Sequence, residues 1–269
     1  MVANVGVLEP PLHGNVRVHH EGPVARVTLE HPGKFNAMSR AMWVDLQAIF
    51  LQIQQDTRVR CVVVQGADGH FCAGGDISEY PDFRFVESTL RDFHEKEVWG
   101  ALQAMLDCDV PIIALIEGNC MGAGVEIASC CDLRIASPAS RFGAPIAKLG
   151  FPMAPREAAL VLRAVGELTA REMLLSAAVM DAPTMLQRGF LNQLAEPAHM
   201  AAMVQRLVER IVPLAPGATR ANKQTLRALT QAQQAQEATD LIASAYCYAA
   251  SDEHREGILA FAQKRSPNF

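Results

Sequence analysis

The chain has 269 residues, 50% of them hydrophobic, and its 29 acidic and 24 basic residues give a formal net charge of −5. This length allows one substantial hydrophobic core with an appended part. The negative charge and the absence of a long basic run exclude the electrostatic pattern of a nucleic-acid binder, so small-molecule chemistry is the better expectation.

Seven cysteines at irregular spacing lie mostly in apolar stretches, which indicates reduced thiols in a cytoplasmic protein rather than a disulfide framework. The opening residues lack the basic and apolar regions of a secretory signal. The most apolar stretch, Val110 to Cys131, contains Glu117 and Glu126, which is not typical of a membrane span. The histidines show no paired ligand spacing, and we expect no metal site.

In chain order, the first predicted element is a hairpin. Residues 16–20 and 24–29 alternate apolar and polar side chains around a Glu-Gly-Pro turn, as two antiparallel strands at a sheet edge would. Ser39 can then cap a helix whose apolar positions recur at helical spacing from Met42 to Ile53.

Three apolar segments further along the chain predict buried strands: Arg60 to Gln65, Pro111 to Ile116 and Leu133 to Ala136. A polar helical segment and a helix from about Gly122 to Cys131 lie between them. Apolar strands that alternate with helices are typical of a parallel sheet covered by helices, so the expected fold class is α/β.

From Pro155 onward the sequence predicts helices, with no strand of comparable quality. The helix from Leu226 to Ile242 is rich in Ala, Gln and Leu and needs a surface against which to bury its apolar face. We therefore expect a core of residues 1–195 and a helical C-terminal module of residues 196–269 that packs on the core or on neighbouring subunits.

Two glycine-rich turns, His70 to Asp76 and Glu117 to Glu126, each follow an apolar strand and precede a helical segment. Glycines leave backbone N–H groups unobstructed, and a helix N-terminus favours developing negative charge. Two converging turns could therefore form a hole for an anionic oxygen. Neither turn has the lysine of a P-loop or the complete dinucleotide-binding spacing, so nucleotide hydrolysis is not expected.

Several segments resemble, in order and spacing, the enoyl-CoA hydratase/isomerase (crotonase) family: HPGKFNAM, FCAGGDI, PIIALIEG through GAGVEIASCCDLRIAS, RFGAPIAKLGF, RAVGELTAREMLL and a terminal FxxKR. The resemblance covers about residues 16–269. It implies a crotonase-like spiral of ββα units with a helical C-terminal trimerisation module, assembled as a homotrimer or homohexamer.

The resemblance also implies the catalytic groups. The backbone N–H groups of Gly75 and Ala123 would form an oxyanion hole around a thioester oxygen, and Glu126 matches the first of two glutamates that the family's hydratases use. Ala123 replaces the usual glycine, which is tolerable for a main-chain donor unless its φ is positive. Ile146 occupies the position of the second glutamate, and isoleucine cannot transfer a proton.

Seven residues match positions at which the family contacts coenzyme A: Lys34, Phe35, Ala37, Ala73, Ile77, Phe261 and Lys264. The first three match the segment at the adenine and phosphates, and the next two line the pantetheine and adenine pocket. The last two belong to a terminal pair that reaches a neighbouring subunit's coenzyme A. Ser78 replaces a basic residue common in the first turn, and residues 81–91 are expected to cover the acyl pocket. Coenzyme A would enter as part of the substrate, with no other cofactor.

The expected activity is hydration of an enoyl-CoA with Glu126 as the single acid/base, or with a further carboxylate such as Glu157 or Asp76. Double-bond isomerisation, acyl-CoA decarboxylation and non-catalytic acyl-CoA binding remain open alternatives. The family's decarboxylases also carry an aliphatic residue at the second glutamate's position. They have, however, a histidine in place of Gly75 and a tyrosine near the position of Met153, and this chain lacks both.

Overall fold

The computed structural model describes residues 13–231 and 245–268. Its larger sheet has the strand order β1-β2-β3-β4-β6-β9. These strands are β1 (Asn15–Glu21), β2 (Val24–Glu30), β3 (Cys61–Gly66), β4 (Ile112–Ile116), β6 (Leu133–Ala136) and β9 (Gln193–Leu194). Strands β1 and β2 pair antiparallel, and the other neighbours pair parallel. The predicted edge hairpin and the three predicted buried strands are confirmed.

Helices make up much of the rest of the described chain. The α-helices are α1 (Arg40–Gln55), α2 (Glu87–Asp92), α3 (Trp99–Asp107), α4 (Ala123–Cys130), α5 (Pro155–Val165), α6 (Glu167–Leu175), α7 (Ala182–Gln187), α8 (Pro197–Ile211), α9 (Pro216–Gln231) and α11 (Asp252–Ala262). The 3₁₀-helices are η1 (Ile77–Asp82), η3 (Ile146–Leu149) and η4 (Cys247–Ala250), and η2 (Phe93–Val98) is a π-helix.

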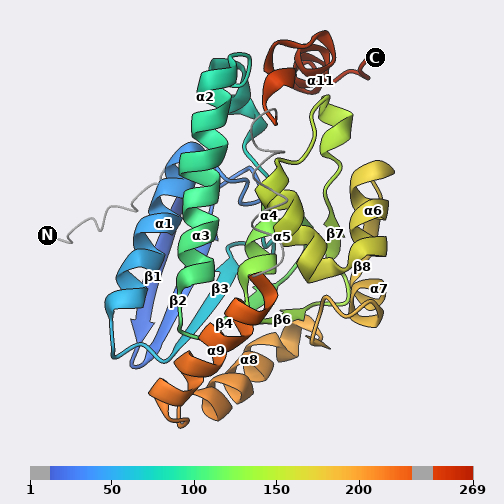
Figure 1. The fold of residues 1–269 in the computed structure, drawn as a ribbon. Helices are drawn as coiled ribbons and strands as arrows, with labels where there is room; N and C mark the ends of the chain where they lie inside the picture. Colours follow the sequence, from blue (N-terminus) through green and yellow to red (C-terminus); the bar gives the residue numbers. More distant parts are fainter. Residues whose placement is uncertain (1–12, 232–244, 269) are drawn as a thin grey trace, which may run out of the picture.

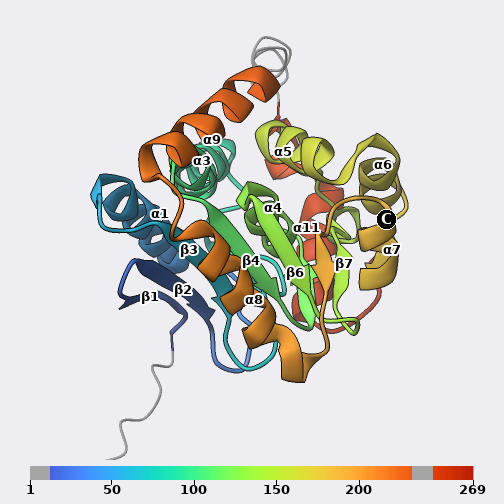
Figure 2. The ribbon, with the colours of Figure 1, turned by 90° about the horizontal axis from the view of Figure 1, so that it is seen from below.

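The larger sheet is covered on both faces (Figures 1 and 2). Apolar side chains of α1, α3 and α4 pack on one face, in the same cluster as Val62, Val64 and Ala114 of the central strands. Helix α8 crosses the opposite face, where its buried Met200 and Val204 pack in a second cluster. Because both faces are buried, the central strands are apolar at nearly every position, as the sequence indicates.

A second, three-stranded sheet was not expected from the sequence. Its strands are β5 (Asn119–Met121), β7 (Arg141–Gly143) and β8 (Val179–Asp181), in the order β5-β7-β8. After Pro155, where the sequence predicts helices and no strand of comparable quality, the structure adds two short strands, β8 and β9. Segments of two or three residues are too short to show a periodicity, and tertiary pairing alone defines them.

The last described helix folds back onto the core. Helix α11 packs against η1 and η3, and Figure 1 shows it near α2 at one end of the molecule. Of the predicted helix from Leu226 to Ile242, residues up to Gln231 belong to α9, and residues 232–244 lie outside the described chain. None of the helices in the described ranges is long and apolar enough to cross a membrane.

Candidate active site

The two glycine-rich turns lie side by side. The N–H groups of Phe71 and Cys72 donate to the carbonyl oxygens of Glu117 and Asn119, each at 2.8 Å, and the N–H of Met121 donates back to Cys72 at 2.9 Å. This short ladder ties the loop after β3 to the loop after β4. The two turns, which are far apart in the sequence, therefore meet at the carboxyl ends of β3 and β4.

Each turn passes through a glycine with positive φ, Gly74 at 114° and Gly122 at 48°. The next residues are Gly75 and Ala123, and neither of their N–H groups donates to an acceptor in residues 13–231 or 245–268. Ala123 is the first residue of α4 and does not have a positive φ, so alanine causes no backbone strain there. Two unpaired amides at the meeting point of two turns are the donors that an oxyanion hole requires.

Glu126 lies in the first turn of α4, three residues beyond Ala123. Its side chain is half-buried, makes no hydrogen bond within the described chain, and does not have its oxygens sealed from solvent. Burial raises the pKa of its carboxyl to about 8; the negative charge of Glu157 adds to the rise, and the Arg84 guanidinium opposes it. An accessible carboxyl that titrates close to neutrality is suited to both taking and giving a proton.

The other two candidate carboxylates are already occupied. Asp76 is buried and accepts hydrogen bonds from Lys34 Nζ at 2.6 Å and from the Ser78 hydroxyl at 2.7 Å. Burial alone would raise the pKa of Asp76, but these hydrogen bonds lower it, so the side chain stays ionised. Glu157 is 1% exposed and its Oε1 lies 2.9 Å from Nδ1 of His94. Asp76 and Glu157 thus each have hydrogen-bond partners, whereas the Glu126 carboxyl has none in the described residues.

A buried polar chain adjoins Glu126 and was not predicted from the sequence. Arg84 is 1% exposed, and its two terminal nitrogens contact Nε2 of His94 at 3.3 Å and the hydroxyl of Tyr248 at 3.1 Å. Its guanidinium also lies 4.0 Å from the ring centre of Phe151. The sequence does not predict this set of polar contacts, because the residues that form it come from a loop, a π-helical segment and two distant helices.

Five of the seven residues matched to coenzyme A contacts are brought together. The segment of Lys34, Phe35 and Ala37 runs along the first turn, where the N–H of Ala73 donates to the Phe35 carbonyl at 3.0 Å. Ile77 follows at the start of η1. The Phe35 ring is 57% exposed and lies 4.6 Å from the ring of His70, so an apolar face is presented beside the turn.

The other two residues stand apart. Phe261 lies in the last turn of α11 and Lys264 just beyond it; both are exposed, and no hydrogen bond or ion pair joins either side chain to the two turns in the described chain. Helix α11 does pack on η1 of its own chain, which begins at Ile77.

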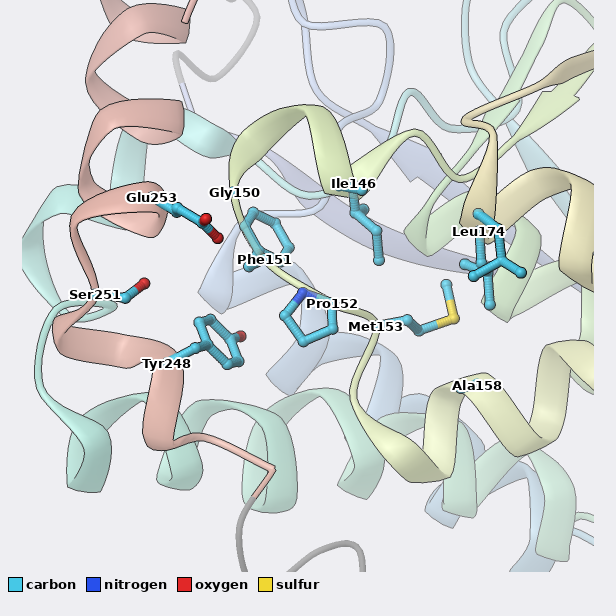
Figure 3. Close-up of a pocket in the computed structure, with 12 residues that line it drawn as sticks. Ile146, Gly150, Phe151, Pro152, Met153, Ala158, Leu174, Tyr248, Ser251 and Glu253 are labelled. Atoms are coloured by element: carbon cyan, nitrogen blue, oxygen red, sulfur yellow. The ribbon is translucent and has the colours of Figure 1, made fainter. Parts of the chain in front are cut away.

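A cavity of about 570 Å³ is lined by η3 and the segment that follows it, by α6 and by the segment from η4 to α11 (Figure 3). Ile146, Met153 and Leu174 gather at one end of it, and Tyr248, Ser251 and Glu253 lie at the other. Glu126, Gly75 and Ala123 do not line it. Phe151 and Tyr248 line the cavity and also contact Arg84, whose positive charge opposes the rise in the pKa of Glu126. The apolar side chains at the first end are of the kind that bind a small hydrophobic group.

Comparison with known proteins identifies the family. A sequence model of enoyl-CoA hydratase/isomerase matches residues 19–269. The chain therefore belongs to this family. It is 30% identical over 256 residues to the short-chain-enoyl-CoA hydratase of Clostridium acetobutylicum, covering 93% of this chain and 95% of the relative. It is also 30% identical over 255 residues to the 2,3-dehydroadipyl-CoA hydratase of Escherichia coli, covering 94% and 97%.

Solved structures agree with this assignment. An enoyl-CoA hydratase/carnithine racemase from Magnetospirillum magneticum matches with a TM-score of 0.78 and 32% identity, over 94% of each chain. A methylmalonyl-CoA decarboxylase in complex with 2-nitronate-propionyl-CoA matches with a TM-score of 0.84 and 26% identity, over 96% of this chain and 98% of the other. The predicted crotonase-like α/β fold is confirmed.

Proposed function

We propose that this protein is an enoyl-CoA hydratase in which Glu126 is the single acid/base group. The observation that carries the proposal is the pairing of an accessible, unpartnered carboxyl of raised pKa with two unpaired backbone donors at Gly75 and Ala123. Relatives named as hydratases at about 30% identity over most of the chain support it.

The geometry suggests the following sequence of events. The thioester oxygen of a 2-enoyl-CoA accepts hydrogen bonds from Gly75 and Ala123, which draws electrons away from the β-carbon. The Glu126 carboxylate takes a proton from water as the water oxygen bonds to the β-carbon, and the double-bond electrons move to the α-carbon and thioester oxygen as an enolate. The protonated Glu126 then gives its proton to the α-carbon. One water is added across the double bond, and Glu126 returns to its starting state.

This single-carboxyl route fits the surroundings. Ile146 supplies no second proton donor, and the bonds of Asp76 and Glu157 leave neither free to replace it. A pKa of about 8 keeps both forms of Glu126 populated near neutral pH, so the same side chain can act in both halves of the reaction.

A decarboxylase is the second candidate. Its specific support is the structural match to methylmalonyl-CoA decarboxylase together with the apolar Ile146 at the second catalytic position. In such a reaction the same oxyanion hole would hold the enolate left by loss of carbon dioxide. Double-bond isomerisation by Glu126 and non-catalytic acyl-CoA binding are the further alternatives.

The coenzyme A end of the substrate is part of the proposal. The exposed ring of Phe35 and the ammonium of Lys34 would meet the adenine and phosphates, while Ala37, Ala73 and Ile77 would line the adjoining wall. Two further residues, Phe261 and Lys264, would contribute from a neighbouring subunit of a homotrimer or homohexamer. We place the trimerisation surfaces on a C-terminal module of residues 196–269 beside a core of residues 1–195. The six buried free cysteines fit a reducing, cytoplasmic location.

A panel of three thioesters tests the proposed function. Purified protein is incubated separately with crotonyl-CoA, a 3-enoyl-CoA and methylmalonyl-CoA. The products are separated by chromatography and identified by mass and, for double-bond isomers of equal mass, by the ultraviolet absorbance of the conjugated 2-enoyl thioester. If the protein is a hydratase, the product from crotonyl-CoA is heavier than the substrate by the mass of one water, and methylmalonyl-CoA is unchanged. Loss of carbon dioxide from methylmalonyl-CoA alone would replace the hydratase assignment with the decarboxylase, and conversion of the 3-enoyl-CoA to its 2-enoyl isomer alone would indicate an isomerase.

A further inference from the structure

Tyr80 stands at the edge of the proposed oxyanion hole. It belongs to η1, whose start is fixed by Asp76 accepting a hydrogen bond from the Ser78 N–H. The Tyr80 ring is buried, with the rings of Phe83 and Phe151 edge-on at 5.9 and 6.0 Å. The Arg84 guanidinium lies over its face at 4.4 Å. These contacts hold the ring in one orientation.

The hydroxyl of Tyr80 is directed at Gly75. A β-carbon placed on Gly75 would lie 2.1 Å from the Tyr80 oxygen, which is well inside van der Waals contact. Only glycine leaves space for this oxygen. The phenol oxygen therefore occupies the position beside the residue whose N–H group is one of the two unpaired amides.

This hydroxyl lacks the partner that a buried tyrosine usually has. The other two tyrosines are satisfied: Tyr246 donates to Glu95 at 2.7 Å, and Tyr248 accepts from Arg84 at 3.1 Å. The Tyr80 hydroxyl makes no hydrogen bond in residues 13–231 and 245–268, although the Tyr80 backbone carbonyl accepts from the N–H groups of Phe83 and Arg84. The hydroxyl oxygen is also not sealed, because the sealed, unpaired side-chain atoms of that part of the chain are Asn15 Oδ1, Glu30 Oε2, Arg84 Nε and His254 Nε2.

The state of the phenol fits a donor. Burial raises the pKa of Tyr80 to about 12, and the positive charge of Arg84 opposes the rise while the negative charge of Glu126 adds to it. The O–H proton is therefore retained at neutral pH. A neutral donor of fixed orientation, with no acceptor of its own, gains most when negative charge develops next to it.

We infer that the Tyr80 hydroxyl is a third donor of the oxyanion hole and a catalytic residue, bonding to the thioester oxygen beside the N–H groups of Gly75 and Ala123. The inference rests on the proposed binding of an acyl-CoA thioester, and it applies equally to hydration, isomerisation and decarboxylation. The bond strengthens as the thioester becomes an enolate, and no proton moves from Tyr80.

Acetoacetyl-CoA provides a test that does not depend on turnover, because this 3-ketoacyl thioester ionises to an enolate with its own ultraviolet absorbance. The ionisation of bound acetoacetyl-CoA is measured on the wild-type protein, on Tyr80→Phe and on Tyr246→Phe. The last variant is a matched control, since it removes a buried tyrosine hydroxyl bonded to Glu95 instead. Affinity for butyryl-CoA, which cannot carry the charge, is measured alongside.

We expect Tyr80→Phe to weaken ionisation of the bound ligand by about ten- to a hundred-fold, the effect of losing one hydrogen bond to a charged group. Affinity for butyryl-CoA and the behaviour of Tyr246→Phe should match the wild type. An unchanged enolate signal in Tyr80→Phe, or an equal loss of affinity for both ligands, would overturn the inference. If Tyr80→Phe weakens the ionisation of acetoacetyl-CoA but the wild type does not hydrate crotonyl-CoA, the hydratase proposal fails while the role of Tyr80 stands.

Discussion

Nδ1 of His94 lies 2.9 Å from Oε1 of Glu157, and both side chains are nearly removed from solvent. Arg84 approaches the other ring nitrogen, Nε2, at 3.3 Å. Because a guanidinium can only donate, Nε2 must accept and Nδ1 must carry the proton that bonds to Glu157. Burial lowers the pKa of His94 despite the nearby carboxylate, so the ring is neutral. A neutral imidazole thus joins a buried cation to a buried anion.

The first prediction concerns the influence of this buried anion on Glu126. Replacing Glu157 with glutamine removes the negative charge that adds to the raised pKa of Glu126. That pKa should fall, and the acidic limb of the pH profile of kcat/KM should move to lower pH. The pH profile for crotonyl-CoA measures the shift.

A matched control is Glu95→Gln. Glu95 accepts a hydrogen bond from Tyr246 and pairs with Arg156, and it does not contribute to the raised pKa of Glu126. Its profile should coincide with that of the wild type. An acidic limb that stays in place in Glu157→Gln would show that burial alone sets the pKa of Glu126.

The second prediction concerns stability. The Glu126 carboxyl titrates near 4.5 when unperturbed and near 8 in the folded protein. The folded state therefore binds the proton more tightly, and the resulting stabilisation is complete below pH 4.5, declines as the pH rises, and is lost above pH 8. Glu126→Gln removes this titration, so its Tm advantage over the wild type should grow across that interval, by about 2–4 °C for each kcal/mol.

Thermal melts at a series of pH values measure this difference. Glu253→Gln, at an exposed position on the cavity wall, serves as the control and should follow the wild type at every pH. Curves for Glu126→Gln and the wild type that stay parallel from pH 4.5 to pH 8 would contradict the raised pKa.

The third prediction separates two roles of Lys34. Its ammonium bonds Asp76 and Ser78 in the free protein, and we propose that it also meets the phosphates of coenzyme A. Lys34→Met should raise KM for crotonyl-CoA by about ten-fold and leave KM for crotonyl-pantetheine unchanged, because the shorter thioester lacks the nucleotide. Lys96→Met, which breaks a surface pair with Asp92, is the control. An equal rise for both thioesters would mean that Lys34 acts only by holding Asp76.

The fourth prediction restores the missing glutamate. Ile146 is half-buried and lines the cavity, so a side chain introduced there can reach a bound acyl group. Ile146→Glu should raise the rate of crotonyl-CoA hydration by at least about ten-fold, because a second acid/base group shares the proton transfers. Ile146→Gln is the control, because glutamine has nearly the same shape as glutamate but cannot transfer a proton. Equal rates for the two variants would show that the single-carboxyl route is not limited by proton supply.

The main sheet could be predicted because its strands are buried on both faces. Cys61–Gly66 and Ile112–Ile116 are apolar throughout their central positions, and the Ser39 cap marks the start of α1. The smaller sheet could not be predicted. Its strands have three residues each, and their pairing depends on where the turn at Glu117 and the segment at Arg141 come to lie.

The sequence predicts only those residues of the candidate site that lie in continuous motifs. Gly75, Ala123 and Glu126 lie in continuous motifs next to strands, so the sequence indicates their neighbourhood. Tyr80 and Arg84 gave no such signal, since a tyrosine hydroxyl and a guanidinium gain their roles from packing between η1, η3 and the C-terminal segments. Two properties that only the three-dimensional structure reveals make these residues important: the Tyr80 hydroxyl is unpaired, and the charge of Arg84 is buried.

We propose that Glu126 performs the proton transfers of hydration. The most direct measurement is the decline in the conjugated absorbance of crotonyl-CoA with wild-type protein and with Glu126→Gln, together with calorimetric affinity for butyryl-CoA. We expect rapid loss of absorbance in the wild type, a rate lower by at least about a hundred-fold in the variant, and equal butyryl-CoA affinity. Hydration at the wild-type rate by Glu126→Gln would show that another group is the acid/base.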